Sequence, residues 1–346
     1  MTLEPVLAGI CGSDLATISA KASRWFEPIV SFPFTPGHEV VAVRGDNGRR
    51  VVLEAVLGCK ARAIDPPCEP CAEGRVGSCQ NLAFGHLSPG LQSGYCSEVG
   101  GGWSESMVAH ESQLHVVPED MGDEAAVMVE PVACALHGAL AEPRAAGGIV
   151  AVLGAGTLGL SLVAALAHYA TPSALIVSAK HPHQAELAKD LGADVTTSAD
   201  GLPRVLRRMT RSLALPGRLS GGADVIYDCV GSPDSLRQAL GVCRPGGTVV
   251  LVGMPAPMRM DLTPLWQREI RLVGAYAYGT EQNGRRSFDM AFELVRSADL
   301  GRLVSARYPL ERYEEALAHA AAAGRRGSVK IVFEPGITSR AGRRNR

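Results

Sequence analysis

Three short stretches within the first 131 residues carry side chains that can bind a metal ion. They are Cys11-Gly12-Ser13-Asp14, Pro36-Gly37-His38-Glu39 and Val129-Glu130-Pro131. A catalytic zinc ion takes three protein ligands and keeps one open position for water or substrate. Cys11, His38 and Glu130 would supply a thiolate, an imidazole and a carboxylate. Each residue alone is more often an ordinary core or surface residue, but together they favour a metal site.

A second group of cysteines lies further along the same half of the chain. Cys59, Cys68, Cys71 and Cys79 are separated by eight, two and seven residues. Four thiolates complete the tetrahedral coordination of zinc and leave no open position, so we expect such a site to support folding rather than chemistry. Two alternatives stay open: a site in which Asp65 takes the place of Cys59, and a lobe without metal.

A glycine-rich fingerprint follows the buried apolar run Ile149–Leu153 and opens a helical stretch. It reads Gly154, Ala155, Gly156, Thr157, Leu158 and Gly159. In this pattern the first glycine permits a tight turn, the second lets a pyrophosphate approach the backbone, and the third allows close packing of helix on strand. The free N–H groups at the start of the helix attract phosphate. The fingerprint therefore predicts a dinucleotide site.

The residues after the second strand of this region indicate which dinucleotide binds. An Asp or Glu about 20 residues beyond the glycines would bind the ribose 2′-hydroxyl of NAD. The chain instead has Ser178-Ala179-Lys180-His181, without a carboxylate. Because Lys180 and His181 can bind a 2′-phosphate, we expect NADP rather than NAD.

The elements that position these groups fall into two patterns. The first 120 residues have short apolar runs interrupted by turn signals, which is typical of an irregular β-rich domain. From about residue 148, strands at 149–153, 174–178, 223–228 and 248–252 alternate with helical stretches, which predicts a parallel sheet wrapped by helices. We expect a catalytic domain over 1–143, a dinucleotide-binding domain over 144–285, a return to the first domain over 286–335, and a disordered tail over 336–346.

In these motifs and their order, the chain resembles the zinc-containing medium-chain dehydrogenases, particularly the sorbitol, threonine and archaeal glucose dehydrogenase branch. The resemblance extends from Cys11 to about Phe333. It implies an α/β protein with a GroES-like β-rich domain and a Rossmann domain, which binds one catalytic and one structural Zn²⁺. It also implies a homodimer or homotetramer and a small-molecule alcohol or carbonyl substrate.

The resemblance also assigns roles beside the metal ligands. Glu39 adjoins the ligand His38 and can approach the metal, Asp14 holds the imidazole by accepting its N–H, and Ser13 passes the substrate proton outward. Zinc acts as a Lewis acid that stabilises the alcohol oxygen while hydride leaves the carbon. The chain departs from the family at Ala16, where a histidine often ends the proton route. Thr17, or the cofactor ribose and water, would then carry the proton.

Composition narrows the function further. The net charge of −1 provides no field that would attract nucleic acid or an anionic membrane, and no apolar run approaches a membrane span. The first residues lack the features of a signal peptide, so we expect a cytoplasmic protein with reduced cysteines. Only ten residues precede Cys11, fewer than in the family, and we expect a truncated amino terminus.

We predict an oxidoreductase that transfers a hydride between a secondary alcohol, polyol or sugar hydroxyl and NAD(P). Two alternatives remain. One is a zinc-independent quinone or enone reductase on the same fold, which the complete set of Cys11, His38 and Glu130 disfavours. The other is a non-catalytic NADPH-binding protein, which only Ala16 supports. The sequence does not identify the alcohol.

Overall fold

The computed structural model describes residues 1–336 and divides into two compact units. Unit 1 comprises Met1–Ala133 and Ala277–Arg346, and unit 2 comprises Cys134–Tyr276. The first division falls inside a continuous helix, α4 (Val129–Leu140), whereas the predicted divisions at 143/144 and 285/286 lie later in the chain. Apart from Gly336, the predicted tail over 336–346 lies outside the described residues.

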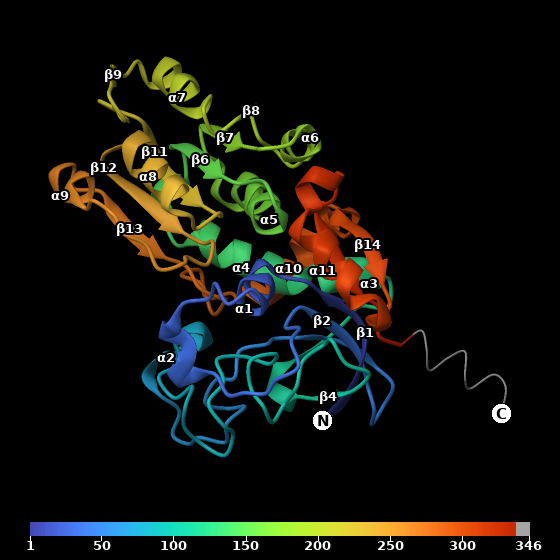
Figure 1. Ribbon diagram of the computed structural model, residues 1–346. Coiled ribbons are helices and arrows are strands. Elements are labelled where there is room, and N and C mark those ends of the chain that lie inside the picture. The colour runs from blue at the N-terminus through green and yellow to red at the C-terminus, as the bar shows by residue number, and fades with distance from the viewer. Residues whose placement is uncertain (337–346) are drawn as a thin grey trace. The chain divides into compact units, whose positions relative to one another are not determined.

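Unit 1 is built on a seven-stranded sheet with the order β14-β15-β1-β2-β3-β5, in which β4 also pairs with β1 (Figure 1). The strands are β1 (Thr2–Gly9), β2 (Val40–Arg44), β3 (Arg50–Leu53), β4 (Met107–Val108), β5 (Leu114–Val116), β14 (Val304–Tyr308) and β15 (Lys330–Phe333). β1 pairs antiparallel with both β2 and β15, and Ala8 faces Val40 on one side and Phe333 on the other. The residues just after β1 therefore lie beside the residues at the starts of β2 and β15.

The helices of unit 1 are short. They are α1 (Gly12–Ile18), α2 (Glu69–Ala72), α3 (Asp123–Val127), α10 (Ser287–Ser297) and α11 (Tyr313–Ala321). Apolar side chains of α11, β15 and the end of β1 form one core, which includes Ile10, Ala316 and Phe333. In this core, α11 and β15 pack against the residues that follow β1.

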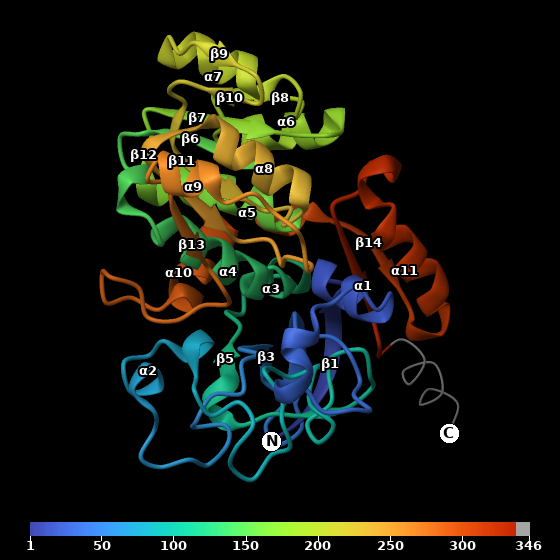
Figure 2. The ribbon, with the colours of Figure 1, turned by 60° about the vertical axis from the view of Figure 1, so that its left-hand side comes forward.

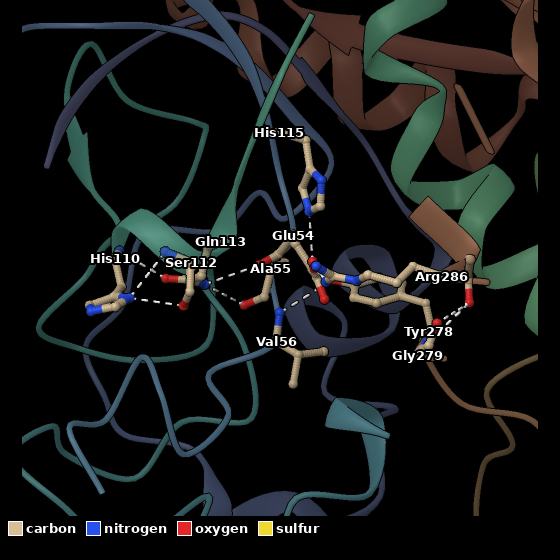
Figure 3. A network of polar contacts seen from close by, with 11 residues as sticks. Glu54, Ala55, Val56, His110, Ser112, Gln113, His115, Tyr278, Gly279 and Arg286 are labelled. Carbon is tan, nitrogen blue, oxygen red and sulfur yellow. Dashed lines mark hydrogen bonds and ion pairs between the residues drawn. The ribbon is translucent and has the colours of Figure 1, made fainter. Parts of the chain in front are cut away.

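Within unit 1, a network of polar contacts connects residues 278–286 to residues 54–56 and to His115 (Figure 3). The Glu54 carboxylate lies 2.7 Å from Nε2 of His115 and also contacts the guanidinium of Arg286. The Tyr278 hydroxyl accepts a hydrogen bond of 3.2 Å from the backbone N–H of Val56. An unpaired carboxylate at the buried position of Glu54 would be costly. The contacts with His115 and Arg286 pair this carboxylate, and they hold residues 278–286 against residues 54–56.

Unit 2 contains a six-stranded parallel sheet with the order β13-β12-β11-β6-β7-β8 (Figure 2). The strands are β6 (Ile149–Leu153), β7 (Ala174–Ser178), β8 (Val195–Thr197), β11 (Ala223–Asp228), β12 (Cys243–Leu251) and β13 (Arg271–Gly274). The strand order reverses between β6 and its neighbours β7 and β11, and ligands of such sheets bind at this point. The predicted fold class, a GroES-like domain with a Rossmann domain, is confirmed.

The helices of unit 2 alternate with the strands as expected for parallel pairing. They are α5 (Thr157–Ala165), α6 (Pro182–Asp190), α7 (Leu202–Thr210), α8 (Pro233–Val242) and α9 (Thr263–Gln267), and a hairpin of β9 (Ala214–Leu215) and β10 (Arg218–Leu219) follows α7. The strands read as apolar runs because both sheet faces are buried; Ile176, Ile226 and Val249 are each 0% exposed. Within the described residues, no helix is long and apolar enough to cross a membrane.

Candidate metal and dinucleotide sites

Cys11, His38 and Glu39 form a compact group of possible metal ligands in unit 1. One ligand atom from each lies within 4.8 Å of the other two. Cys11 precedes α1, and His38 and Glu39 precede β2, so the antiparallel pairing of β1 with β2 brings the two segments together. His38 is 5% exposed and Glu39 is 2% exposed. A thiolate, an imidazole and a carboxylate in a buried position fit a zinc ion.

Asp14 holds both ends of this group. Its Oδ2 accepts a hydrogen bond of 2.9 Å from the backbone N–H of Cys11, and its Oδ1 lies 3.4 Å from Nδ1 of His38. Burial lowers the pKa of His38, but the Asp14 carboxylate and the Cys11 sulfur outweigh burial and raise that pKa well above its ordinary value. The negative charge of Asp14 also favours a metal cation bound to Nε2 of His38.

Lys330 is the buried cation of the site. Its ammonium contacts the Glu39 carboxylate and donates a hydrogen bond of 3.2 Å to the carbonyl oxygen of Ile10. Burial lowers the pKa of Lys330, but Glu39, Cys11 and Glu130 together raise it above its ordinary value, so the side chain stays charged. Gly9 leaves room for this pair, because a Cβ atom there would lie 1.9 Å from Oε2 of Glu39.

Two other residues predicted for this site, Glu130 and Ser13, lie in α4 and α1. Glu130 is 4% exposed in the first turn of α4 and acts electrostatically on Lys330, but it does not belong to the compact group of Cys11, His38 and Glu39. Ser13 lies in α1, where its carbonyl oxygen accepts a hydrogen bond of 2.9 Å from Thr17. The structure thus groups Glu39, rather than Glu130, with Cys11 and His38.

The four cysteines Cys59, Cys68, Cys71 and Cys79 form a second group, whose sulfur atoms lie within 4.8 Å of one another. Sγ of Cys59 lies 3.6 Å from that of Cys68 and 3.8 Å from that of Cys79. Tetrahedral zinc with Zn–S bonds of about 2.3 Å separates its sulfur ligands by about 3.8 Å, so this group fits zinc. Asp65 is exposed and outside the group.

N–H groups donate hydrogen bonds to sulfur atoms in this lobe, and burial raises the pKa of Cys71 and of Cys79. The side-chain amide of Asn81 donates to Sγ of Cys59 at 3.2 Å, and its backbone N–H donates to Cys79 at 3.4 Å. Burial raises the pKa of Cys68, but N–H groups of Gln80 and Cys71 outweigh it and lower the pKa to about 7. Such N–H donors stabilise the charged form that binds metal.

The glycine fingerprint lies between β6 and α5, where the sheet order reverses. Gly154 has a φ of +91°, which favours glycine, and a Cβ atom on Gly159 would lie 1.9 Å from the carbonyl oxygen of Gly154. A Cβ atom on Gly156 would meet nothing within 4 Å, so the backbone there is open. Thr157 and Leu158 begin α5. This loop can cradle a pyrophosphate.

Ala179, Lys180 and His181 follow β7 beside this loop. The backbone N–H of Gly154 donates to the carbonyl oxygen of Ser178 at 3.0 Å, which joins the end of β7 to the fingerprint turn. Lys180 is exposed, and the His181 ring stacks on His183 at 5.9 Å between centroids. The Nε2 atom of His183 is buried without a hydrogen-bond partner. Three cationic or N–H groups therefore follow the strand, and none is acidic.

Lys330 and Tyr95 were absent from the site predicted by sequence. The Tyr95 ring packs 5.9 Å from that of His38, and its hydroxyl lies 3.5 Å from Oδ1 of Asp14. Lys330 lies 291 residues from Glu39, so no local spacing connects the two residues. The apolar context of Lys330 in Ser-Val-Lys-Ile-Val-Phe was the one available indication of a buried cation.

Two family models match most of the chain. A model described as the alcohol dehydrogenase GroES-like domain matches residues 1–119, and a zinc-binding dehydrogenase model matches residues 157–297. These ranges contain the two cysteine-bearing groups and most of the parallel sheet.

Curated relatives and solved structures align over nearly the whole chain. L-idonate 5-dehydrogenase of Vitis vinifera is 28% identical over 94% of this chain and 85% of the relative. Sorbitol dehydrogenase of Arabidopsis thaliana is 27% identical with the same two coverages. A Sinorhizobium meliloti protein, assigned as a zinc-binding dehydrogenase and crystallised bound to NADP, is 26% identical, with a TM-score of 0.74 over 97% of this chain and 92% of that chain.

Proposed function

This chain belongs to the zinc-dependent medium-chain alcohol dehydrogenases, and we propose that it transfers a hydride between NADP and a secondary alcohol, polyol or sugar hydroxyl. The observation that carries the proposal is the buried group of Cys11, His38 and Glu39, which Asp14 and Lys330 hold from either side. Structural zinc sites are closed by four protein ligands, whereas this group provides three and leaves room for water or substrate.

We propose Cys11, His38 and Glu130 as the ligands of the catalytic zinc. Glu39 is a neighbouring carboxylate that can approach the metal. A bound zinc supplies a Lewis acid that stabilises negative charge on the substrate oxygen. Around the metal, Asp14 would orient His38 through Nδ1, and the Lys330 ammonium would hold the Glu39 carboxylate in an ion pair. Ser13 takes the substrate proton and passes it outward. The burial of Glu130 and its action on Lys330 support its place near this group.

The second zinc in this proposal is held by Cys59, Cys68, Cys71 and Cys79 and has a structural role. The sulfur separations and the N–H donors around them support it. Elemental analysis of gently purified protein tests both sites at once. Two zinc ions per chain are expected, and one or none would contradict the assignment of two sites.

For the cofactor we propose NADP, bound with its pyrophosphate on Gly154, Gly156, Thr157, Leu158 and Gly159. Ala179 removes the acid that would repel a 2′-phosphate, Lys180 offers positive charge, and His181 offers an N–H donor. A charge-assisted contact contributes about 1.5–3 kcal/mol, which corresponds to about a tenfold to hundredfold preference. The variant Ala179→Asp/Lys180→Ala should shift kcat/KM toward NAD. A higher kcat/KM with NAD in the unaltered enzyme would contradict the choice of NADP.

We further propose a homodimer, or a homotetramer built from it, in the cytoplasm. β13 is an edge strand of the parallel sheet, and Leu272 on it is 40% exposed, with Trp266 80% exposed close before it in the chain. An apolar edge of this kind pairs readily with a second copy. Sedimentation of a monomer at micromolar concentration would contradict this assembly. Thiolate ligands favour a reducing compartment, and cell fractionation tests that location.

The two alternative functions make different predictions. A zinc-independent reductase would keep its turnover after zinc is removed with a chelator, whereas the proposed enzyme loses it. A non-catalytic NADPH-binding protein would bind zinc and cofactor without oxidising any alcohol. A screen of secondary alcohols, polyols and sugars with both cofactors separates these functions and searches for the substrate.

A further inference from the structure

A small cavity of about 250 Å³ lies in unit 1 next to the group of Cys11, His38 and Glu39; we call it the side cavity. Most of its wall is apolar. Its lining residues are Asp14, Thr17, Ile18, Phe32, Pro33, Phe34, Pro36 and Tyr95. Pockets that enclose drug-sized ligands measure about 300–1,000 Å³, so the side cavity suits a smaller molecule or part of one.

The polar groups of the side cavity gather at one end, and two of the three are already engaged. Asp14 accepts the N–H of Cys11 and lies 3.4 Å from His38. Thr17 donates its hydroxyl to the carbonyl oxygen of Ser13 at 2.9 Å, which leaves the lone pairs of Oγ1 as acceptors. These hydrogen bonds hold both side chains in place, and oxygen atoms of both can accept a further hydrogen bond from a molecule in the cavity.

Tyr95 has the weakest hydrogen bonds of the three polar residues in the side cavity, so its hydroxyl can bind a ligand most readily. Its hydroxyl lies 3.4 Å from Oγ1 of Thr17 and 3.5 Å from Oδ1 of Asp14, both longer than an ordinary O–H···O hydrogen bond of about 2.7–2.8 Å. A phenolic hydroxyl is a hydrogen-bond donor at neutral pH. A ligand hydroxyl could therefore form a shorter bond than either present contact.

The position of this hydroxyl is well defined. The Tyr95 ring packs 5.2 Å from Phe34 and 5.9 Å from His38 between centroids, and the residue is 7% exposed. Because His38 is a proposed metal ligand, the Tyr95 ring packs beside the proposed metal site. Groups held in this way can select substrates.

We propose that the side cavity binds the part of the substrate next to the reacting carbon, and that Tyr95, with Thr17, binds a second hydroxyl there. This inference rests on the proposed function and narrows its substrate class. An extended polyol or sugar would place several hydroxyls against Phe34 and Pro36, which are half-buried and offer no hydrogen-bond partner to replace the lost water. A short-chain vicinal diol instead presents one hydroxyl to Tyr95 and an apolar end to these walls.

Steady-state kinetics of the zinc-loaded, full-length enzyme with three alcohols tests this inference. The probes are 2,3-butanediol, 2-butanol, which lacks the second hydroxyl, and sorbitol, an extended polyol. In the unaltered enzyme we expect the highest kcat/KM with the diol. Tyr95→Phe should lower kcat/KM for the diol about tenfold, mainly through KM, and that for 2-butanol less than twofold. Tyr313→Phe, which changes an exposed tyrosine on α11, is the matched control and should change neither.

Three results would overturn the inference. Equal losses on the diol and on 2-butanol in Tyr95→Phe, at unchanged zinc content, would mean that Tyr95 does not recognise a second hydroxyl. A higher kcat/KM for sorbitol than for the diol in the unaltered enzyme would refute the assigned substrate class while leaving the dehydrogenase function intact. Turnover of none of these or other alcohols, with zinc and cofactor bound, would instead refute the proposed function and the inference with it.

Discussion

Replacing Lys330 by methionine should destabilise unit 1 severely, although the two side chains have similar volumes. Lys330 is 1% exposed, and its ammonium contacts the Glu39 carboxylate, which is 2% exposed. The variant leaves this carboxylate buried without its cation. Breaking one partner of a buried pair costs about 3–5 kcal/mol, which corresponds to a change of about 100-fold to several thousandfold in the folding equilibrium. Little of this loss comes from packing, because Met fills the same space.

Denaturant unfolding followed by tryptophan fluorescence provides the assay. Trp103 packs 5.0 Å from Phe333 of β15, and its indole N–H donates to the carbonyl oxygen of Gly9 at 3.1 Å. Trp25 and Trp266 are 82% and 80% exposed, so the change in emission on unfolding reports mainly on Trp103. The midpoint of this transition in Lys330→Met should fall well below that of the unaltered enzyme.

Two controls separate charge from packing. Lys330→Arg keeps the cation beside Glu39 and should lose less stability than Lys330→Met. The double variant Lys330→Met/Glu39→Gln removes both charges and should recover most of the loss, because no buried charge is left unpaired. If Lys330→Met unfolds at the same denaturant concentration as the unaltered enzyme, or if the double variant is no more stable than the single one, the argument from a buried ion pair is wrong.

Three further substitutions test other parts of the two sites. Cys68→Ser should reduce the zinc content by one ion per chain and lower the unfolding midpoint, because a structural zinc contributes folding free energy; an unchanged zinc count would contradict the four-cysteine site. Gly9→Ala should lower kcat at least tenfold while NADP binding persists, since its Cβ atom would lie 1.9 Å from Oε2 of Glu39, and normal kcat would show that the pair can shift freely. Gly159→Ala should weaken NADP binding at unchanged zinc content, because its Cβ atom would lie 1.9 Å from the carbonyl oxygen of Gly154; calorimetric titration measures the affinity, and an unaltered value would refute the need for glycine there.

The parts of the sites that sequence could predict are those encoded by neighbouring residues. The glycine fingerprint and the strand before it lie within a dozen residues, and the structure places them as β6, turn and α5. The cysteine lobe also has short spacings, and the structure groups Cys59, not Asp65, with the other three cysteines. In both cases local chain geometry brings the groups together, so spacing carries the information.

The parts that sequence missed depend on which strands become neighbours. Lys330 meets Glu39 because β1 pairs with β2 on one side and with β15 on the other. No local pattern specifies that the last strand of the chain returns beside the first. Tyr95 is a similar case, because it lies in an irregular stretch between Cys79 and β4, and its contact with His38 depends on how that loop folds. The grouping of Glu39 with Cys11 and His38 follows from the same pairing.

The central position of β1 explains how Cys11, His38, Glu39 and Lys330 come together. Cys11 follows β1 directly, His38 and Glu39 precede β2, and Lys330 opens β15. With antiparallel neighbours on both sides, the end of β1 lies opposite the starts of β2 and β15, so one thiolate, one imidazole, one carboxylate and one ammonium converge without a loop reaching across. The backbone N–H of Gly9 donates to the carbonyl oxygen of Glu39 at 2.8 Å, and that of Ile10 donates to Ile331 at 3.0 Å. The ladder that holds the sheet together therefore also fixes the separation of the ligands, and a shift in the register of β15 would remove the cation from Glu39.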